Sequence, residues 1–168
     1  MKIIIVYQSS TGFTKQYAQW IGEALSCDVK DIKEVTPEKI GEYDRIIYGG
    51  WIMGNNVAGL EKIKRMNPQS IVVFAVGATP DGEEIRSAIK AQNHIESTPF
   101  FYMEGGMRFE RLNLLVRAML KVVMKSVKKK QSKTAQDEFM EKNLGSSFDN
   151  SDKKYIEPLV TYIKGLSA

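Results

Sequence analysis

Short apolar segments recur along the chain at regular intervals, and each is followed by a stretch with helical spacing. Segments of this length, rich in isoleucine, valine and aromatic residues, predict buried strands. The predicted strands are Ile3–Tyr7, Val29–Ile32, Ile46–Tyr48, Ile71–Val76 and Phe100–Met103. We expect the third of them to end at the paired glycines Gly49-Gly50.

The stretches between these strands carry apolar residues on one face, as helices do. The predicted helices cover about 14–25, 56–65 and 81–92, with a last helix from about residue 151. Thr36-Pro37 indicates one more helix start, as an N-cap followed by proline at the first helical position. Strands that alternate with helices indicate a parallel sheet covered on both faces. The sequence therefore predicts an α/β fold, a doubly wound five-stranded parallel sheet, as a single domain over residues 1–168.

The loops that follow the strands hold most of the candidate chemistry. They cover residues 9–14, 49–55, 77–82 and 105–106. Because a doubly wound sheet binds its ligand at the carboxyl ends of its strands, all four loops should lie at the ligand-binding edge.

The first of these loops joins a strand directly to a helix and reads Ser9-Ser10-Thr11-Gly12-Phe13-Thr14. It offers hydroxyl groups, backbone N–H groups and a helix N-terminus to one anion, and the loop itself contains no lysine or metal ligand. It lacks the Gly-Lys-Ser/Thr ending of a Walker loop and the three spaced glycines of a dinucleotide site. The loop predicts a site for a phosphate monoester held without metal, and an ordinary capped turn is the structural alternative.

The pattern hydroxyl-x-Thr-Gly-x-Thr in this loop resembles the phosphate loop of the flavodoxin family, and the similarity covers roughly residues 1–106 and 148–168. The resemblance implies a flavodoxin-like fold with FMN as the cofactor. It places the FMN phosphate on the side chains of Ser9, Thr11 and Thr14 and on the amides of residues 10–14.

Two further loops are expected to contact the flavin ring. Met53-Gly54-Asn55 resembles the Met-Gly-Asp or Met-Gly-Asn of some short-chain flavodoxins, which implies that Met53 lies against the ring and that the Gly54 peptide turns over on reduction. Trp51 offers a flat apolar face to the ring, or is an ordinary core residue. The expected ring contacts are Gly50, Trp51, Ile52, Met53, Gly54, Asn55, Gly77, Ala78 and Thr79.

The loop with Gly77, Ala78 and Thr79 lacks the stacking aromatic that flavodoxins often place there. One face of the ring is therefore open to a substrate, or it is covered by Trp51 or by an insertion.

Basic charge is concentrated in one part of the chain. Residues 108–133 contain nine lysines and arginines and one acid, Glu110, although the whole chain has a formal net charge of only +4. From Phe109 to Lys128, apolar residues and basic residues alternate with helical spacing, which predicts an amphipathic helix with a basic stripe. The polar stretch of about 129–150 that follows is predicted to be a loop or to be poorly ordered.

A minimal flavodoxin lacks the segment of about 107–147, so we interpret it as a basic helical insertion before the last helix. Three interpretations stay open: a helix packed on the sheet, docking of 108–133 to an anionic membrane surface or a quinone, and an interface with a redox partner protein or in a homodimer. The basic residues are not interleaved with stacking aromatics, so nucleic acid is not indicated.

The position and basic character of this insertion, after Phe100–Gly106, are similar to the menaquinone-dependent protoporphyrinogen dehydrogenase family. This resemblance implies an FMN protein that passes electrons from a porphyrinogen to a membrane quinone.

Other features limit the function classes. The single cysteine, Cys27, fits a reducing compartment, and no apolar run reaches the roughly 20 residues of a membrane span. We expect a cytoplasmic protein, with a peripheral position at the inner face of the membrane as the alternative. No cluster has metal-ligand spacing, and no catalytic residue can be assigned.

The functional prediction is an FMN-binding redox protein. It is either an oxidoreductase linked to a porphyrinogen or a quinone, or a soluble one-electron carrier. A flavin-free binding or signalling domain on the same fold is the alternative of another class.

Overall fold

A parallel sheet forms the centre of the protein in the computed structural model, which describes residues 1–143 and 145–166. Along the sheet the strands follow the order β2 (Asp28–Asp31), β1 (Ile3–Gln8), β3 (Arg45–Met53), β5 (Ile71–Gly77) and β6 (Phe100–Glu104), and each neighbouring pair is parallel. The order reverses direction at β1 and β3, which is the switch point where doubly wound sheets bind ligands. The predicted five-stranded parallel sheet is confirmed.

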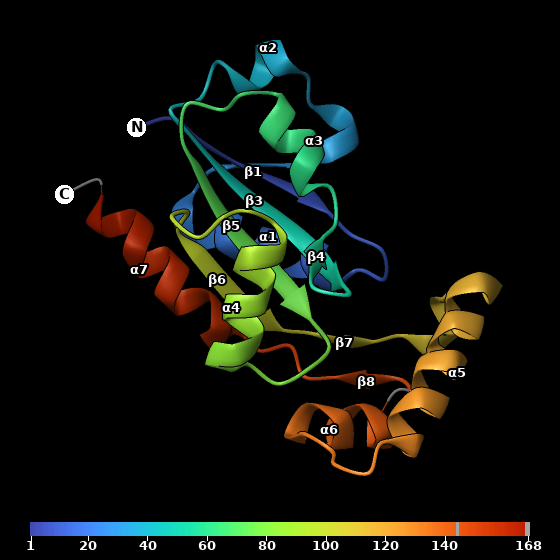
Figure 1. Cartoon of the computed structure of the whole chain (residues 1–168). Coiled ribbons are helices and arrows are strands. Elements are labelled where there is room, and N and C mark those ends of the chain that lie inside the picture. The colour runs from blue at the N-terminus through green and yellow to red at the C-terminus, as the bar shows by residue number, and fades with distance from the viewer. Residues whose placement is uncertain (144, 167–168) are drawn as a thin grey trace.

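Helices cover both faces of this sheet (Figure 1). One face is covered by α1 (Phe13–Leu25) and α7 (Glu157–Gly165), and the other by α2 (Pro37–Ile40), α3 (Leu60–Arg65) and α4 (Glu83–Gln92). Short 3₁₀ turns, η1 (Ile32–Glu34) and η3 (Lys153–Ile156), follow β2 and precede α7. Successive strand side chains point to opposite faces, so Ile4 packs in the core under α3 and Ile5 in the core under α1.

The prediction that Gly49 and Gly50 end the third strand is wrong. β3 continues to Met53 and turns back into β4 (Asn56–Val57), which pairs with it antiparallel. The expected helix over 56–65 therefore begins only at Leu60.

Close packing explains why both positions are glycine. A Cβ atom on Gly49 would lie 2.0 Å from Cζ of Phe74, and one on Gly50 would lie 2.6 Å from the carbonyl oxygen of Ala58. Neighbouring groups fill the space that a side chain needs, so these glycines continue the strand instead of ending it.

The insertion leaves the carboxyl edge of the sheet as a two-stranded ribbon, β7 (Gly106–Met107) paired antiparallel with β8 (Phe148–Asp149). Beyond the ribbon lie the 3₁₀ turn η2 (Phe109–Arg111) and two helices, α5 (Leu114–Lys129) and α6 (Ala135–Asn143) (Figure 1). The single helix predicted from Phe109 is divided because Asn113 caps α5, its side chain accepting the Val116 N–H at 2.9 Å. The predicted basic helical insertion before the last helix is otherwise present.

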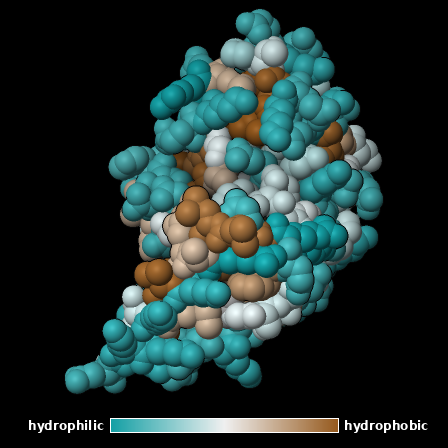
Figure 2. Space-filling model, turned by 90° about the vertical axis from the view of Figure 1, so that its right-hand side faces the viewer, coloured by the Kyte–Doolittle hydropathy of each residue, from teal (hydrophilic) through white to brown (hydrophobic). Residues whose placement is uncertain are grey.

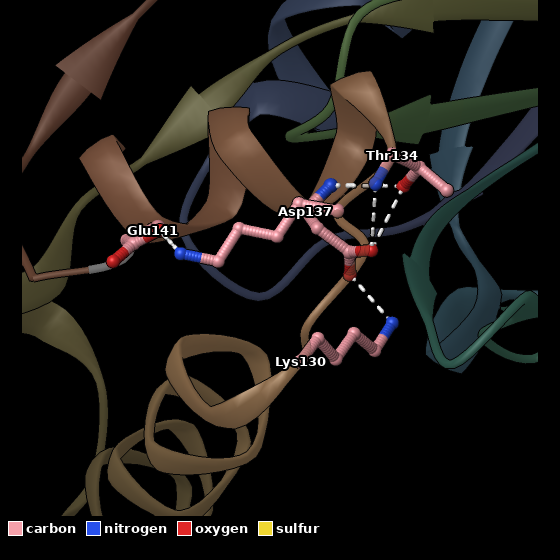
Figure 3. A network of polar contacts seen from close by, with 5 residues as sticks. Lys130, Thr134, Asp137 and Glu141 are labelled. Atoms are coloured by element: carbon pink, nitrogen blue, oxygen red, sulfur yellow. Dashed lines mark hydrogen bonds and ion pairs between the residues drawn. The ribbon is translucent and has the colours of Figure 1, made fainter.

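The prediction of a loop over 129–150 is wrong, because α6 lies within it. Thr134 and Asp137 cap this helix reciprocally: the Thr134 hydroxyl accepts the Asp137 N–H at 3.2 Å, and the Asp137 carboxylate accepts the Thr134 N–H at 3.0 Å (Figure 3). Lys130 pairs with the same carboxylate at 2.7 Å, and this contact, together with Thr134, lowers the pKa of Asp137 to about 2. Lys133 pairs with Glu141.

Three residues lie outside the described part of the chain. They are Leu144, which falls in the predicted loop, and residues 167–168, at the end of the predicted domain.

Tyr17 on α1 joins the two ends of the insertion. Its side chain is fully buried, and its hydroxyl donates to the Glu104 carbonyl at 2.5 Å and accepts the Asp152 N–H at 3.1 Å. Because Glu104 precedes the ribbon and Asp152 follows it, the base of the insertion is fixed beside the N-terminal half of α1.

Candidate functional site

The loop between β1 and α1 has the geometry of an anion site. Gly12 takes the left-handed conformation with φ of 104°, and its N–H donates to the Ser9 hydroxyl at 3.2 Å. α1 begins at Phe13 with no side-chain cap, so the N–H groups of its first turn have no acceptor within the helix. Together with the helix dipole, these groups favour a bound anion.

The hydroxyl of Thr14, in that first turn, is buried and has no hydrogen-bond partner. Only 1% of this residue is exposed. A buried polar group without a partner costs about 1–3 kcal/mol, so such groups are rare in folded proteins. An oxygen atom of a bound phosphate would supply the missing partner, and the loop therefore fits this group.

An open cleft of about 270 Å³ lies at the loop. Its lining includes Ser9, Ser10, Thr11 and Gly12 together with Tyr7, Lys15, Asp31 and Arg111. Burial and the nearby carboxylates of Asp31 and Glu34 raise the pKa of Tyr7, so its hydroxyl stays protonated at neutral pH. The cleft thus combines neutral hydroxyls, two cations and one carboxylate.

Two arginines of the insertion reach this loop, and the sequence did not place them there. Arg111 lines the cleft, and Arg108 donates to the Thr11 carbonyl at 2.7 Å with its guanidinium 4.5 Å from the centre of the Phe13 ring. The signal in the sequence was the start of the basic segment directly after Gly106. Arg108 and Thr11 are 97 residues apart, so only the fold could show the contact.

The second loop is the tight turn between β3 and β4. Gly54 and Asn55 both have positive φ, 54° and 65°, as the two-residue turn of a hairpin requires. Asn93 is a buried residue directly after the C-terminal end of α4. Its side chain donates to the Asn55 carbonyl at 2.7 Å and accepts the Val57 N–H at 2.9 Å. Sequence reasoning missed this residue, whose role depends on a contact between distant segments.

Of the residues expected at the ring, Gly50, Trp51, Ile52 and Met53 lie in β3 rather than in a loop. Met53, at the end of the hairpin, has 51% of its surface exposed. An exposed methionine at the carboxyl end of β3 is available to contact a ligand, and the tight turn fixes the strand end that carries it.

The third loop is anchored by Tyr102 of β6. The Tyr102 hydroxyl donates to the Thr79 carbonyl at 2.8 Å and lies 3.1 Å from the Thr79 hydroxyl. A Cβ atom on Gly77 would lie 1.9 Å from this hydroxyl, so Gly77 permits the approach. Burial raises the pKa of Tyr102 to about 12. Tyr102 is thus a buried support of the loop that holds Gly77, Ala78 and Thr79, a role that sequence reasoning missed.

Strand register brings the three loops together at one edge. Gln8 pairs with Gly50, and Trp51 pairs with Val76, so the residues that follow β1 and β5 flank the end of β3. The Gly105 N–H donates to the Gly77 carbonyl at 2.8 Å, which joins the third loop to the start of the insertion.

The family model for the flavodoxin domain matches residues 4–134. The chain belongs to the flavodoxin domain family. Membership in this family supports a flavin cofactor and a redox function for the chain.

Solved structures of flavodoxins are similar to this one. A flavodoxin from the domain Archaea is 23% identical, with 61% of this chain and 78% of that chain covered and a TM-score of 0.42. Flavodoxin 2 from Bacillus cereus is 20% identical, with 62% and 84% covered and a TM-score of 0.46. Flavodoxin 1 from Bacillus cereus is 17% identical, with 78% and 100% covered and a TM-score of 0.47. No curated protein matches the chain.

Other parts of the molecule offer less chemistry. An open depression of about 600 Å³ lies at the C-terminal end of α1 around Cys27, far along the helix from the loops. Burial raises the pKa of the Cys27 thiol to about 11, which disfavours the reactive thiolate. Within residues 1–143 and 145–166, no cluster of acidic, histidine or cysteine side chains could hold a metal ion, and no helix is long and apolar enough to cross a membrane.

Proposed function

We propose that the chain binds FMN and transfers electrons through it. The phosphate would lie on the loop with Ser9, Thr11 and Thr14, and the ring between the β3–β4 hairpin and the loop at 77–79. The observation that carries this proposal is the buried Thr14 hydroxyl without a partner, beside the uncapped start of α1. Bound flavin supplies the redox chemistry, and the protein binds it, orients it and shields it from water.

The hairpin would hold the ring edge. Met53 is exposed at its end, and a Cβ atom on Gly54 would meet nothing within 4 Å, so the positive φ alone favours glycine there. This freedom supports a Gly54 peptide that can turn over when the flavin is reduced.

Titration of the purified protein with FMN, FAD and riboflavin tests the proposed function. We expect a yellow complex that releases FMN on denaturation, and an affinity for FMN at least about 100-fold above that for riboflavin, because each bond to the charged phosphate contributes about 1.5–3 kcal/mol. Equal affinities for FMN and riboflavin would place the phosphate outside the loop, and no uptake of any flavin would support a flavin-free domain.

We also propose that α5 docks on an anionic membrane surface, with a quinone or a porphyrinogen as the flavin's reaction partner. Leu114, Leu115 and Val122 have 83%, 71% and 64% of their surfaces exposed. Figure 2 shows apolar side chains gathered on the face that carries α5, with hydrophilic surface around them. Basic residues of the same helix are Arg117, Lys121, Lys125, Lys128 and Lys129.

An exposed apolar face bordered by lysines and arginines is typical of helices that lie in the membrane interface. Each basic residue near an anionic bilayer adds about 1 kcal/mol of attraction. Because the insertion starts at the carboxyl end of β6, this helix lies beyond the same edge of the sheet as the loops proposed to bind flavin (Figure 1).

Cosedimentation with vesicles tests the docking of α5. We expect the unaltered chain to bind vesicles that contain phosphatidylglycerol, and the Leu115→Ser/Val122→Ser variant to bind at least about 10-fold more weakly, since full burial of one such side chain contributes about 1.5–3 kcal/mol. Leu166→Ser, which changes an exposed leucine on the opposite part of the molecule, serves as the matched control.

Vesicle binding that both variants retain would contradict this docking surface. Absence of vesicle binding, with rapid electron exchange with an acidic carrier protein, would support a soluble carrier. Dimerisation lost with the α5 variant would instead identify a homodimer interface.

A further inference from the structure

Arg111 belongs to the insertion, yet it faces the loop that would hold the cofactor phosphate. We propose that Arg111 binds the FMN phosphate and that Arg108 positions it, so that the insertion is part of the cofactor site. This inference rests on the proposed function, and it changes the role of the insertion from an added surface to a source of a phosphate ligand.

Arg108 fixes the start of η2 on the loop. Its guanidinium donates to the Thr11 carbonyl at 2.7 Å and covers the Phe13 ring at 4.5 Å. A Cβ atom on Gly12 would lie 2.7 Å from Nη1 of Arg108, so the arginine packs against the open side of this glycine. The insertion and the loop are therefore held together by a hydrogen bond, a cation–π contact and close packing.

The turn η2 is also fixed from its other side. The Ser147 hydroxyl accepts the Phe109 N–H at 2.8 Å and donates to the Glu110 carboxylate at 2.5 Å. The Arg111 N–H donates to the Arg108 carbonyl at 2.9 Å, which closes the turn. The position of Arg111 thus follows from contacts on both sides of the turn and needs no ligand.

Arg111 has charge available for an anion. Arg111 lines the cleft with Ser9, Ser10, Thr11 and Gly12, and none of the ion pairs found among the described residues involves its guanidinium. The adjacent carboxylate of Glu110 accepts the Ser147 hydroxyl, and that of Asp31, which also lines the cleft, accepts the Lys33 N–H at 3.0 Å. A guanidinium suits this place because it presents several N–H donors to phosphate oxygens.

The unpartnered Thr14 hydroxyl points to a ligand independently of Arg111. It lies in the first turn of α1, directly after the Gly12 and Phe13 positions that Arg108 covers. A phosphate dianion would receive hydroxyl and amide donors from the loop and a guanidinium from the insertion. The cations near it, Lys15, Arg108 and Arg111, outnumber the one carboxylate of the cleft, Asp31.

Binding of FMN and of riboflavin to Arg111→Gln tests this inference. We expect the affinity for FMN to fall about 10- to 100-fold, as for loss of a charge-assisted contact, while the affinity for riboflavin, which lacks the phosphate, changes less than about twofold. Lys121→Gln removes the same charge from the insertion outside the cleft and should leave both affinities unchanged. Arg111→Lys should recover part of the loss.

The possible results separate the two proposals. An Arg111→Gln variant that binds FMN as the unaltered chain does overturns this inference and leaves the proposed function intact. Equal losses for FMN and riboflavin also overturn it, because they assign Arg111 a structural role. If the unaltered chain takes up no flavin, the proposed function fails and this inference fails with it.

Discussion

Replacing Thr14 by valine is expected to raise the Kd for FMN by about 10- to 100-fold, since a hydrogen bond to a charged acceptor contributes about 1.5–3 kcal/mol. Valine has nearly the same shape as threonine but has no hydroxyl. The Thr14 hydroxyl is buried and unpartnered in the structure, so the bound phosphate is its expected acceptor.

The same substitution should have the opposite effect on the flavin-free protein. Removing a buried, unsatisfied hydroxyl and keeping the shape is neutral or stabilises the fold by up to about 1 kcal/mol. A ligand-binding role therefore predicts a protein that is as stable as before, or more stable, and binds FMN poorly. A role in the fold predicts a loss of stability.

Fluorescence titration with FMN and riboflavin, together with urea unfolding of the flavin-free protein, measures both effects. Thr134→Val is the control, because the Thr134 hydroxyl already has a partner, the Asp137 N–H at 3.2 Å, and Thr134 is not among the residues proposed to bind FMN. The control should lower the free energy of unfolding by more than it lowers the free energy of FMN binding. If Thr14→Val destabilises the protein and leaves FMN affinity unchanged, the hydroxyl serves the fold and not a ligand.

The features that the sequence predicted are those encoded by neighbouring residues. The buried strands are continuous apolar runs, and the loop at 9–14 contains its hydroxyls, its glycine and the start of its helix in one short segment. Local chemistry therefore makes this loop a candidate phosphate site from the sequence alone. The capping pair Thr134 and Asp137 is equally local, but the polar composition around it led to the prediction of a loop.

The features that the sequence missed depend on contacts between distant residues. Arg108 reaches Thr11 across 97 residues, and Asn93 holds a hairpin that lies 36 residues away at Val57. A basic segment shows its charge in the sequence but not its partners. Only the return of the chain through the ribbon of β7 and β8 brings the first residues of this segment to the loop.

Glycine is the residue for which the sequence was most ambiguous, and Gly49 shows why. A glycine can mark a turn or the close approach of another group, and the two look alike in a sequence. In the structure Gly49 lies within β3, opposite Phe74 on β5. The side chain of Phe74 is fully buried and occupies the space in which a Cβ atom would lie.

Replacing Gly49 by alanine is accordingly expected to lower the free energy of unfolding by about 3 kcal/mol, the upper part of the usual range for overpacking a core. The new Cβ atom would lie 2.0 Å from Cζ and 2.5 Å from both Cε atoms of Phe74. Urea unfolding measures the loss. The double variant Gly49→Ala/Phe74→Leu should recover part of it, because the smaller side chain vacates the contested space, and a double-mutant cycle gives the coupling.

Gly82→Ala is the control for the effect of alanine itself. A Cβ atom at Gly82 would meet nothing within 4 Å, and the φ of −173° at this position is open to any residue. The free energy of unfolding of the Gly82→Ala variant should therefore differ from that of the unaltered protein by less than about 0.5 kcal/mol. Gly49→Ala with the same small effect would mean that β3 ends at its glycines, as the sequence pattern suggested. A large effect relieved by Phe74→Leu would instead show that β3 continues past Gly49, which places Trp51 and Met53 on a rigid strand at the edge where the flavin is proposed to bind.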